Sequence, residues 1–326
     1  MNDWKIYFGR KKLEDLGDPP PWRDFSTLNS KDNDFDLSRG RKFVPDEEEI
    51  EFVNAALYLR RPLLVTGKPG RGKSSLAYSV SQQLDLGKVL RWSINSRSTL
   101  NEGLYQYDAI ARLRDATINK DKNEKTEEKI GDYIKLGPLG TALVKSESKK
   151  PRVLLIDEID KSDIDLPNDL LHVLEEGRFE IPELVREARK DSKPVEVLTA
   201  DIGEERETVK IENGIVYCRA FPFILLTSNG EKELPPAFYR RCLRLELKDP
   251  DENRLKEIIK NHLPDTDVDE IYKLLEELLI DENGELREIP VDQLLNVVFL
   301  ISKDASLNLK DEGTKKLLEK LLREIE

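Results

Sequence analysis

The chain has 326 residues, of which 38% are hydrophobic and 36% charged, and it carries a formal net charge of −12. This size and composition support one large folded domain or two ordinary ones and exclude a wholly disordered chain. The acidic balance argues against a general nucleic-acid-binding surface, and two cysteines provide no disulfide framework. No stretch resembles a signal peptide or a membrane span, so we expect a cytoplasmic protein without membrane contact.

The N-terminal part of the chain predicts an arm followed by a helix. Residues 1–42 contain three consecutive prolines and a turn-rich segment at 29–40, which predicts an irregular arm. Residues 44–59 begin with acidic side chains, which the positive end of the helix dipole favours, and continue with an apolar stripe at helical spacing. We therefore predict a helix there.

Short apolar runs then alternate with helical patterns. This alternation predicts an α/β fold with a mainly parallel sheet and helices on both sides. The predicted strands are residues 62–66, 88–94, 152–160, 221–229 and 241–247. Beyond them only helical patterns remain, at 250–262, 267–280, 291–302 and 310–325. We therefore predict an α/β domain over residues 43–249 and a small all-α domain over residues 250–326.

A glycine-rich loop separates the first predicted strand from a helix. Its sequence, Gly67-Lys68-Pro69-Gly70-Arg71-Gly72-Lys73-Ser74, matches the phosphate-binding pattern G-x-x-x-x-G-K-[ST] in full. Glycines allow backbone N–H groups to converge on phosphate oxygens, and the helix N-terminus adds partial positive charge. We expect Lys73 to contact the β- and γ-phosphates, Ser74 to bind Mg²⁺, and Ser75 to complete the nucleotide-binding segment. The alternative is a glycine-rich turn that binds nothing, but the full match between strand and helix favours phosphate binding.

Polar residues follow two of the predicted strands. Ligands bind at the carboxyl ends of parallel strands, so Asp157 is expected to hold Mg²⁺ and Glu158 to polarise the attacking water. Asn229, at the end of another strand, is expected to hold that water. Taken alone, such acids also suit a helix N-cap, and such an asparagine suits a turn. Their combination with the phosphate loop favours the catalytic interpretation.

Two arginines, Arg240 and Arg241, come just before the last predicted strand. They are either ordinary surface charge, or one of them reaches the nucleotide of a neighbouring subunit as an arginine finger.

The order of phosphate loop, acidic strand, asparagine-ended strand and paired arginines resembles the AAA+ ATPases, and more narrowly their MoxR-like and dynein-related branch. Residues 105–115, 133–140 and 226–245 are similar to MoxR-type ATPases of bacterial conflict and defence systems. The resemblance covers roughly residues 43–326. It implies an AAA+ P-loop αβα sandwich with a five-stranded parallel sheet, a helical lid, the cofactors ATP and Mg²⁺, and a homo-oligomeric ring, usually a hexamer.

The resemblance also implies roles for further segments. Residues 103–140 correspond to an insert of this branch. Residues 196–219, which alternate around an Asn-Gly turn signal, correspond to a hairpin that lines the pore of the ring or lies on its surface. Arg241 matches the finger position better than Arg240. Arg287 is the candidate for a lid arginine that contacts the γ-phosphate, although its place before Pro290 also suits a residue flanking a helix.

The favoured function is an ATP-hydrolysing ring that remodels or activates a partner protein, often one with a von Willebrand A domain in this family. One alternative is a nucleotide-dependent assembly switch in a defence system. A nucleic-acid motor is the other, and the acidic composition speaks against it. The client, the trigger and the choice between ATP and GTP stay open.

Overall fold

A computed structural model describes residues 18–24, 34–122, 129–191, 193–201, 207–279, 289–303 and 312–322. The chain divides into two compact units. Unit 1 comprises residues 1–46, 67–79 and 246–326, and unit 2 comprises residues 47–66 and 80–245. The domain boundaries at residues 42 and 249 stay predictions.

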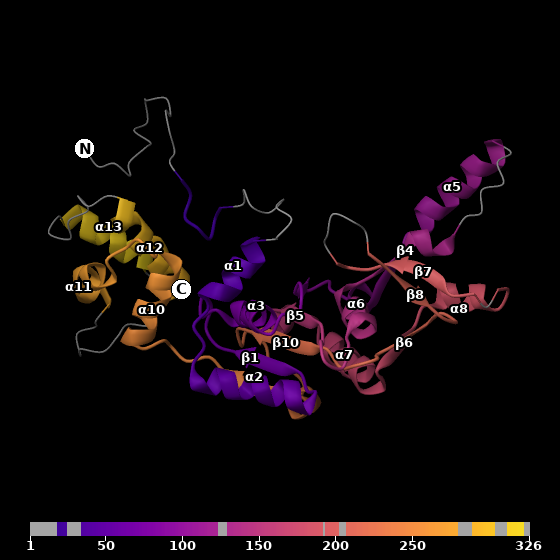
Figure 1. The fold of residues 1–326 in the computed structure, drawn as a ribbon, viewed down its shortest axis with the longest axis horizontal. Helices are drawn as coiled ribbons and strands as arrows, with labels where there is room; N and C mark the ends of the chain where they lie inside the picture. Colours follow the sequence, from indigo (N-terminus) through magenta and orange to yellow (C-terminus); the bar gives the residue numbers. More distant parts are fainter. Residues whose placement is uncertain are drawn as a thin grey trace. The chain divides into compact units, whose positions relative to one another are not determined.

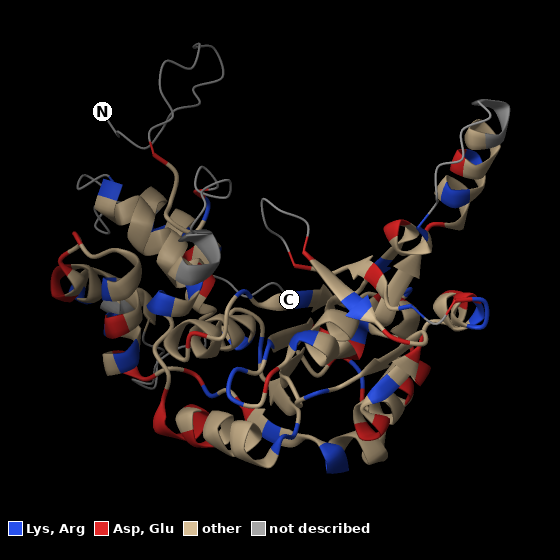
Figure 2. Cartoon of the chain, turned by 45° about the vertical axis from the view of Figure 1, so that its right-hand side comes forward, with Lys and Arg blue, Asp and Glu red and all other residues tan. Residues whose placement is uncertain are grey.

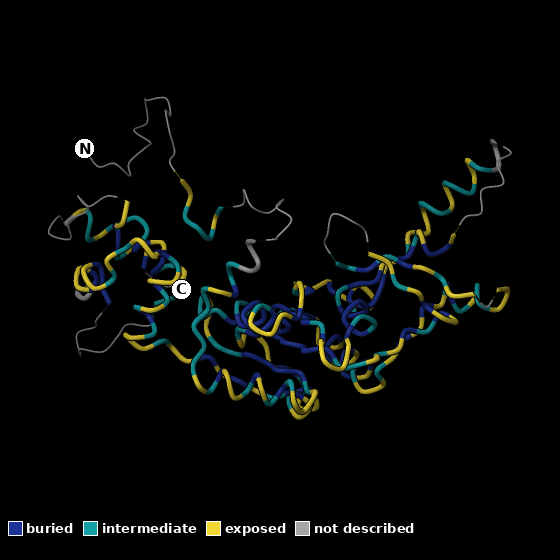
Figure 3. The backbone as a smooth tube through the Cα atoms, in the orientation of Figure 1, coloured by how far each residue is buried: buried dark blue, intermediate teal, exposed yellow. Residues whose placement is uncertain are grey.

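The five predicted strands form one sheet (Figure 1). They are β1 (Leu63–Thr66), β2 (Leu90–Ser93), β5 (Val153–Asp157), β10 (Phe223–Ser228) and β11 (Leu243–Glu246), in the order β11-β1-β10-β5-β2. The pairs β1–β10, β10–β5 and β5–β2 are parallel. Every residue of β5 and β10 is buried, as central strands covered on both faces should be (Figure 3). The predicted α/β fold with a five-stranded parallel sheet is confirmed.

Helices of unit 2 pack on this sheet. They include α2 (Glu47–Leu59), α6 (Pro138–Lys145), α7 (Asp165–Glu176) and α9 (Pro236–Arg241). The predicted helix at 44–59 is confirmed by α2, whose first turn is acidic. Leu143 of α6 and Leu170 of α7 join Ile156 and Ile224 of the sheet in one apolar cluster. This packing fixes the strand ends that carry the polar residues.

The insert over residues 103–140 has a structure of its own. It contains the end of α4 (Leu100–Leu104), the antiparallel pair β3 (Tyr105–Tyr107) and β4 (Ile134–Leu136), helix α5 (Ala109–Lys122), the 3₁₀ turn η1 (Ile130–Tyr133) and the start of α6. Helix α5 extends away from the rest of unit 2 (Figures 1 and 2) and carries interspersed basic and acidic residues. On it, Ile110 is 82% exposed and Leu113 is 70% exposed.

Residues 196–219 do contain an antiparallel pair, but its two strands are not joined by the predicted Asn-Gly turn. Asn213 and Gly214 do turn the chain, with φ of 54° and 74°. However, β8 (Thr208–Ile211) pairs with β7 (Val195–Leu198), whereas β9 (Ile215–Tyr217) pairs with β6 (Arg178–Glu180). A single bridge, Glu212 to Ile215, joins the two sides of the turn.

Tertiary contacts explain this divergence. The Gly214 carbonyl accepts a hydrogen bond of 2.8 Å from the Ile181 N–H, directly before α8 (Pro182–Ala188). Ile211 and Val216, on either side of the turn, are both buried in the core of unit 2. The turn is therefore tied to α8, and its two flanks join different sheets.

The four predicted C-terminal helices are present in unit 1. They are α10 (Glu252–His262), α11 (Val268–Leu279), α12 (Val291–Lys303) and α13 (Glu312–Leu322). They bury a common apolar cluster, in which Ile259, Leu275, Val298 and Leu318 are each 0% exposed. No helix within the described ranges is both long and apolar enough to cross a bilayer.

The predicted irregular arm is wrong at its end, because residues Asp34–Lys42 form helix α1. Asp, Asn and Ser favour turns, but they also favour helix starts, so the composition alone did not separate the two. Three basic residues lie in the last turn of α1, where they suit the helix dipole. The Arg39 guanidinium also lies 4.5 Å from the centre of the Tyr78 ring, which adds a tertiary contact.

Candidate functional site

The glycine-rich loop has the backbone that phosphate binding requires. It starts at Gly67, directly after β1, and ends in the first turn of α3 (Lys73–Gln83). Gly67, Gly70 and Gly72 have φ of 141°, 78° and 81°, values that residues with a side chain rarely adopt. A Cβ atom at Gly70 would also lie 2.5 Å from the Oδ1 atom of Asp292. The glycines of the motif are therefore needed for both conformation and space.

Lys73 closes this loop from inside. Its Nζ donates to the carbonyl oxygens of Gly67 at 2.6 Å and Lys68 at 2.8 Å, and the residue is 8% exposed. Lys68 and Pro69 are exposed at the loop tip. Because α3 starts at Lys73, the lysine charge and the N–H groups of the helix N-terminus lie in the same turn, an arrangement that suits an anion.

The remaining residues of the loop are held by short hydrogen bonds. Arg71 donates to the Leu247 carbonyl oxygen at 2.9 Å and pairs with Asp249 at 2.5 Å. Ser74 and Ser75 are half-buried in the first turn of α3, and the Ser75 N–H donates to the Gly72 carbonyl oxygen at 2.9 Å. The loop thus has a defined shape before any ligand binds.

In unit 2, three of the predicted site residues gather at one edge of the sheet. Thr66, the last residue of β1, is paired with Ser228 at the end of β10, and Asp157 at the end of β5 is paired with Ser93. Asp157, Glu158 and Asn229 therefore follow strands that end at the same edge. The phosphate loop leaves β1 at this edge too.

Asp157 is a buried oxygen donor. It is 7% exposed; its Oδ1 accepts from the Thr227 hydroxyl at 2.8 Å and its Oδ2 from Arg91 at 2.6 Å. One carboxylate combined with a serine hydroxyl and substrate phosphates is a donor set that suits Mg²⁺. By the chemistry of their oxygen atoms, Asp157 and Ser74 fit the predicted metal.

Glu158 is held in an unusual backbone conformation. Its φ of 63° and ψ of 51° lie in the left-handed region, and its N–H donates to the Thr227 hydroxyl at 2.8 Å. The carboxylate is 40% exposed and lies 2.9 Å from Lys161 Nζ. The hydrogen bond from Lys161 to Glu158 raises the pKa of that lysine. The carboxylate reaches solvent, as a residue that acts on water must.

Asn229 is positioned by a carboxylate that the sequence did not single out. Asp160 Oδ2 accepts the backbone N–H groups of Asn229 and Glu231, each at 3.0 Å. Asp160 is 1% exposed, and its buried Oδ1 has no hydrogen-bond partner among the described residues. This residue therefore links the turn after β5 to the turn after β10.

The two candidate finger arginines end α9 and are exposed. The Arg241 guanidinium pairs with the Glu175 carboxylate of α7 and donates to the Ala237 carbonyl oxygen at 3.3 Å. The Arg240 carbonyl oxygen accepts from Arg61 at 2.5 Å. Their roles toward a neighbouring subunit stay predictions. Arg287 lies outside the described residues.

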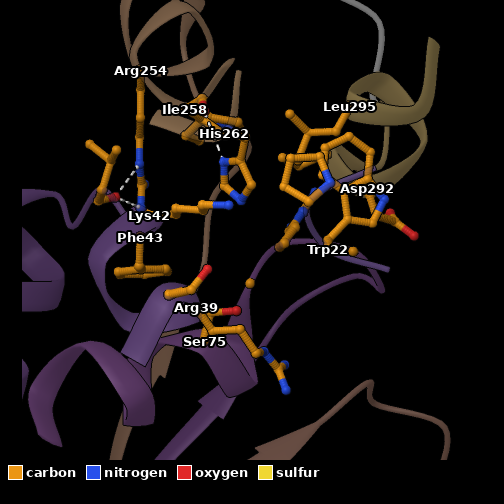
Figure 4. Close-up of a pocket in the computed structure, with 18 of the residues that line it drawn as sticks. Trp22, Arg39, Lys42, Phe43, Ser75, Arg254, Ile258, His262, Asp292 and Leu295 are labelled. Atoms are coloured by element: carbon orange, nitrogen blue, oxygen red, sulfur yellow. Dashed lines mark hydrogen bonds between the residues drawn. The ribbon is translucent and has the colours of Figure 1, made fainter. Parts of the chain in front are cut away.

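A cavity of about 430 Å³ lies beside the phosphate loop within unit 1 (Figure 4). Gly70, Gly72 and Ser75 contribute one wall. Apolar and aromatic side chains contribute others: Trp22, Phe43, Ile258, Val291 and Leu295. Six of the lining residues are lysine or arginine and one, Asp292, is acidic. A flat aromatic group attached to an anion suits such a cavity.

The sequence missed several of these residues. Asp160 belongs to the acidic segment that ends the third predicted strand, so the sequence could have indicated it as a site residue. Its hydrogen bonds to the turn after β10 could not be predicted from the sequence. Thr227 and Arg91 lie within strands and had none. Trp22 and His262 line the cavity from distant segments, and only tertiary packing identifies them.

Comparison with solved structures finds weak likenesses. NtrX from Brucella abortus in complex with ADP matches 86% of this chain and 55% of its own, at 14% identity and a TM-score of 0.39. The same protein in complex with ATP matches 81% of this chain and 51% of its own, at 13% identity and a TM-score of 0.38. A candidate ATPase from Cytophaga hutchinsonii matches 90% of this chain and 76% of its own, at 13% identity and a TM-score of 0.36. The chain thus spans about half the length of the NtrX structures, and scores this low support no conclusion about activity.

Curated protein sequences give no significant match. A family model, in contrast, matches residues 62–242, more than half of the chain, from just before β1 to the end of α9. That model describes the AAA domain of the dynein-related subfamily. The match confirms the resemblance that the motifs indicated: the chain belongs to the dynein-related subfamily of AAA domains.

Proposed function

We propose that this chain is an ATPase that works as a ring of identical subunits, six in the form usual for the branch it resembles. One observation carries the proposal. A complete phosphate loop, closed by Lys73, leaves β1 at the sheet edge where Asp157, Glu158 and Asn229 are gathered.

Each residue then has a role that suits its chemistry. Lys73 and the loop N–H groups offset the charge of the phosphates. Ser74 and Asp157 hold Mg²⁺, which withdraws charge from the phosphates when bound. Glu158 polarises the attacking water, and Asn229 orients it.

An arginine from the neighbouring subunit completes the reaction. Arg241, or failing that Arg240, stabilises the charge that develops on the γ-phosphoryl group. For this, Arg241 must leave Glu175, its partner within its own chain. A head-to-tail interface of this kind closes into a ring by repeated rotation.

The energy of hydrolysis is used, in this proposal, to remodel or activate a partner protein, with von Willebrand A domain proteins as the first class to test. A cytoplasmic role in bacterial defence rests on the resemblance of the motifs alone. The net charge of −12 and the interspersed charges in Figure 2 do not favour a nucleic-acid motor.

The test combines ATP binding, phosphate release and particle mass with and without a non-hydrolysable ATP analogue. Lys73→Ala should lose ATP binding without unfolding, since the loop contributes little to the core. Glu158→Gln should bind ATP but hydrolyse it about 10²-fold more slowly, the scale for loss of a positioned base. Glu233→Gln, an exposed acid nearby, is the matched control.

Unchanged ATP affinity in Lys73→Ala, or a wild-type rate in Glu158→Gln, would contradict the assigned roles. A particle mass that ATP analogues leave at the monomer value would contradict the ring.

A further inference from the structure

The cavity beside the phosphate loop contains one histidine, at the end of α10. The Nδ1 atom of His262 lies 2.9 Å from the Ile258 carbonyl oxygen. A carbonyl oxygen only accepts hydrogen bonds, so Nδ1 must carry the proton. In the neutral ring, Nε2 then carries a lone pair and acts as an acceptor.

The surroundings keep this ring neutral. Burial lowers the pKa of His262, and the nearby Lys42 ammonium lowers it further, while the hydrogen bond to Ile258 opposes both. The Trp22 ring packs edge-on against the imidazole, with ring centres 6.2 Å apart. In Figure 4 the His262 ring extends from α10 toward Lys42 and Trp22.

Two other polar groups of the cavity are committed within the protein. Trp22 Nε1 donates to Asn296 Oδ1 at 3.1 Å. The Arg254 guanidinium donates to the Val44 carbonyl oxygen at 2.7 and 3.0 Å and to Asp46 at 3.1 Å. Among the described residues, none donates a hydrogen bond to His262 Nε2. An acceptor is therefore left for a ligand.

We propose that His262 is the residue that selects adenine over guanine nucleotides. This inference rests on the proposed function, because it places the phosphates on the loop and the base in the adjoining cavity. Adenine presents an amino group at position 6, which donates to Nε2, whereas guanine presents an oxygen there. Two acceptors that face each other repel, so a guanine base makes no hydrogen bond to Nε2. The cavity thus discriminates by the 6-substituent of the purine.

The test measures dissociation constants of ATP, ITP and GTP by calorimetry with the full chain. ITP is the sharpest probe because it carries an oxygen in place of the 6-amino group, with a proton on the adjacent N1, and keeps the sugar and phosphates. The wild type should bind ATP at least about 10-fold more tightly than ITP and GTP, the scale of one lost hydrogen bond. His262→Phe keeps an aromatic ring against Trp22 and removes the acceptor. The ratio of the affinities for ATP and ITP (the ATP:ITP ratio) should therefore fall toward one.

Two further variants keep the result interpretable. His262→Gln offers both a donor and an acceptor, so it should bind all three nucleotides with a reduced ratio even if the phenylalanine variant folds poorly. Asn261→Ala, at an exposed neighbour, should leave the ratio unchanged. An ATP:ITP ratio near one in the wild type, or an unchanged ratio in both His262 variants, would overturn the inference while leaving the proposed ATPase intact. A wild type that binds none of the three would refute the proposed function itself and this inference with it.

Discussion

Asp160→Ala is expected to slow ATP hydrolysis while leaving ATP binding nearly unchanged. Asp160 touches neither the phosphate loop nor water in the proposed reaction, but its Oδ2 accepts the N–H groups of Asn229 and Glu231 at 3.0 Å each. Without this tether the turn that carries Asn229 is free to shift. A displacement of about 1 Å typically costs about 10²-fold in rate, so kcat should fall by that order with little change in KM.

The cost in stability can be worked from the same contacts. Glu231 is exposed and Asn229 is half-buried, so water can replace part of the lost acceptor, and losing the two hydrogen bonds costs about 1–3 kcal/mol together. Removing the buried Oδ1, which has no hydrogen-bond partner in the described part of the chain, recovers up to about 1–3 kcal/mol. The net loss is therefore at most about 3 kcal/mol, which is small against the ~5–15 kcal/mol of a typical domain, so the variant should stay folded.

A double-mutant cycle separates positioning from a general loss of structure. If Asp160 acts through Asn229, the change Asp160→Ala should have little further effect on kcat in an Asn229→Ala background. Asp160→Asn is the matched control, because its amide oxygen still accepts both N–H groups and should retain most of the activity. Additive effects in the cycle, or a kcat within twofold of wild type in a folded Asp160→Ala, would refute the reasoning.

Two further predictions concern assembly and pH. Arg241→Ala should hydrolyse ATP far more slowly and retain its ATP affinity, whereas Glu175→Gln, which frees the arginine, should not slow hydrolysis. Mixing Arg241→Ala with Lys73→Ala should restore partial phosphate release. Wild-type turnover in single Ala variants at both positions 240 and 241 would exclude the shared site. Burial raises the pKa of the Cys242 thiol from 9.0 to about 12, so its contribution to stability is present below pH 9 and is lost as the pH rises from 9 to 12. The difference in unfolding free energy between wild type and Cys242→Ala should shrink across that range, and rapid alkylation of native Cys242 at pH 8 would contradict its burial.

The strands and the phosphate loop were predictable because their signals are local. A continuous apolar run such as residues 153–157 is typical of a central strand that is buried on both faces, and a phosphate loop needs glycines at fixed spacing. The sequence order of these elements also sufficed to gather Asp157, Glu158 and Asn229, since parallel strands end at the same edge.

What the sequence did not reveal depends on contacts between distant residues. The Asn213-Gly214 turn was recognised, but its tie to Ile181 sends β8 and β9 to different sheets. Asp160 and Asn229 are 69 residues apart in the sequence, so the residues around each of them do not predict the hydrogen bond between them. His262 acquires its role from a cavity that also draws on residues 21–23 and 38–44.

The left-handed backbone at Glu158 has a consequence for anyone who seeks a more heat-resistant form of this protein. A residue with a side chain in this conformation costs on the order of 1–3 kcal/mol, which glycine avoids and asparagine reduces. A screen that rewards thermal stability alone would therefore enrich Glu158→Gly and Glu158→Asn. Both remove the carboxylate that the proposed reaction uses, so at this position resistance to heat and turnover of ATP are opposing selections.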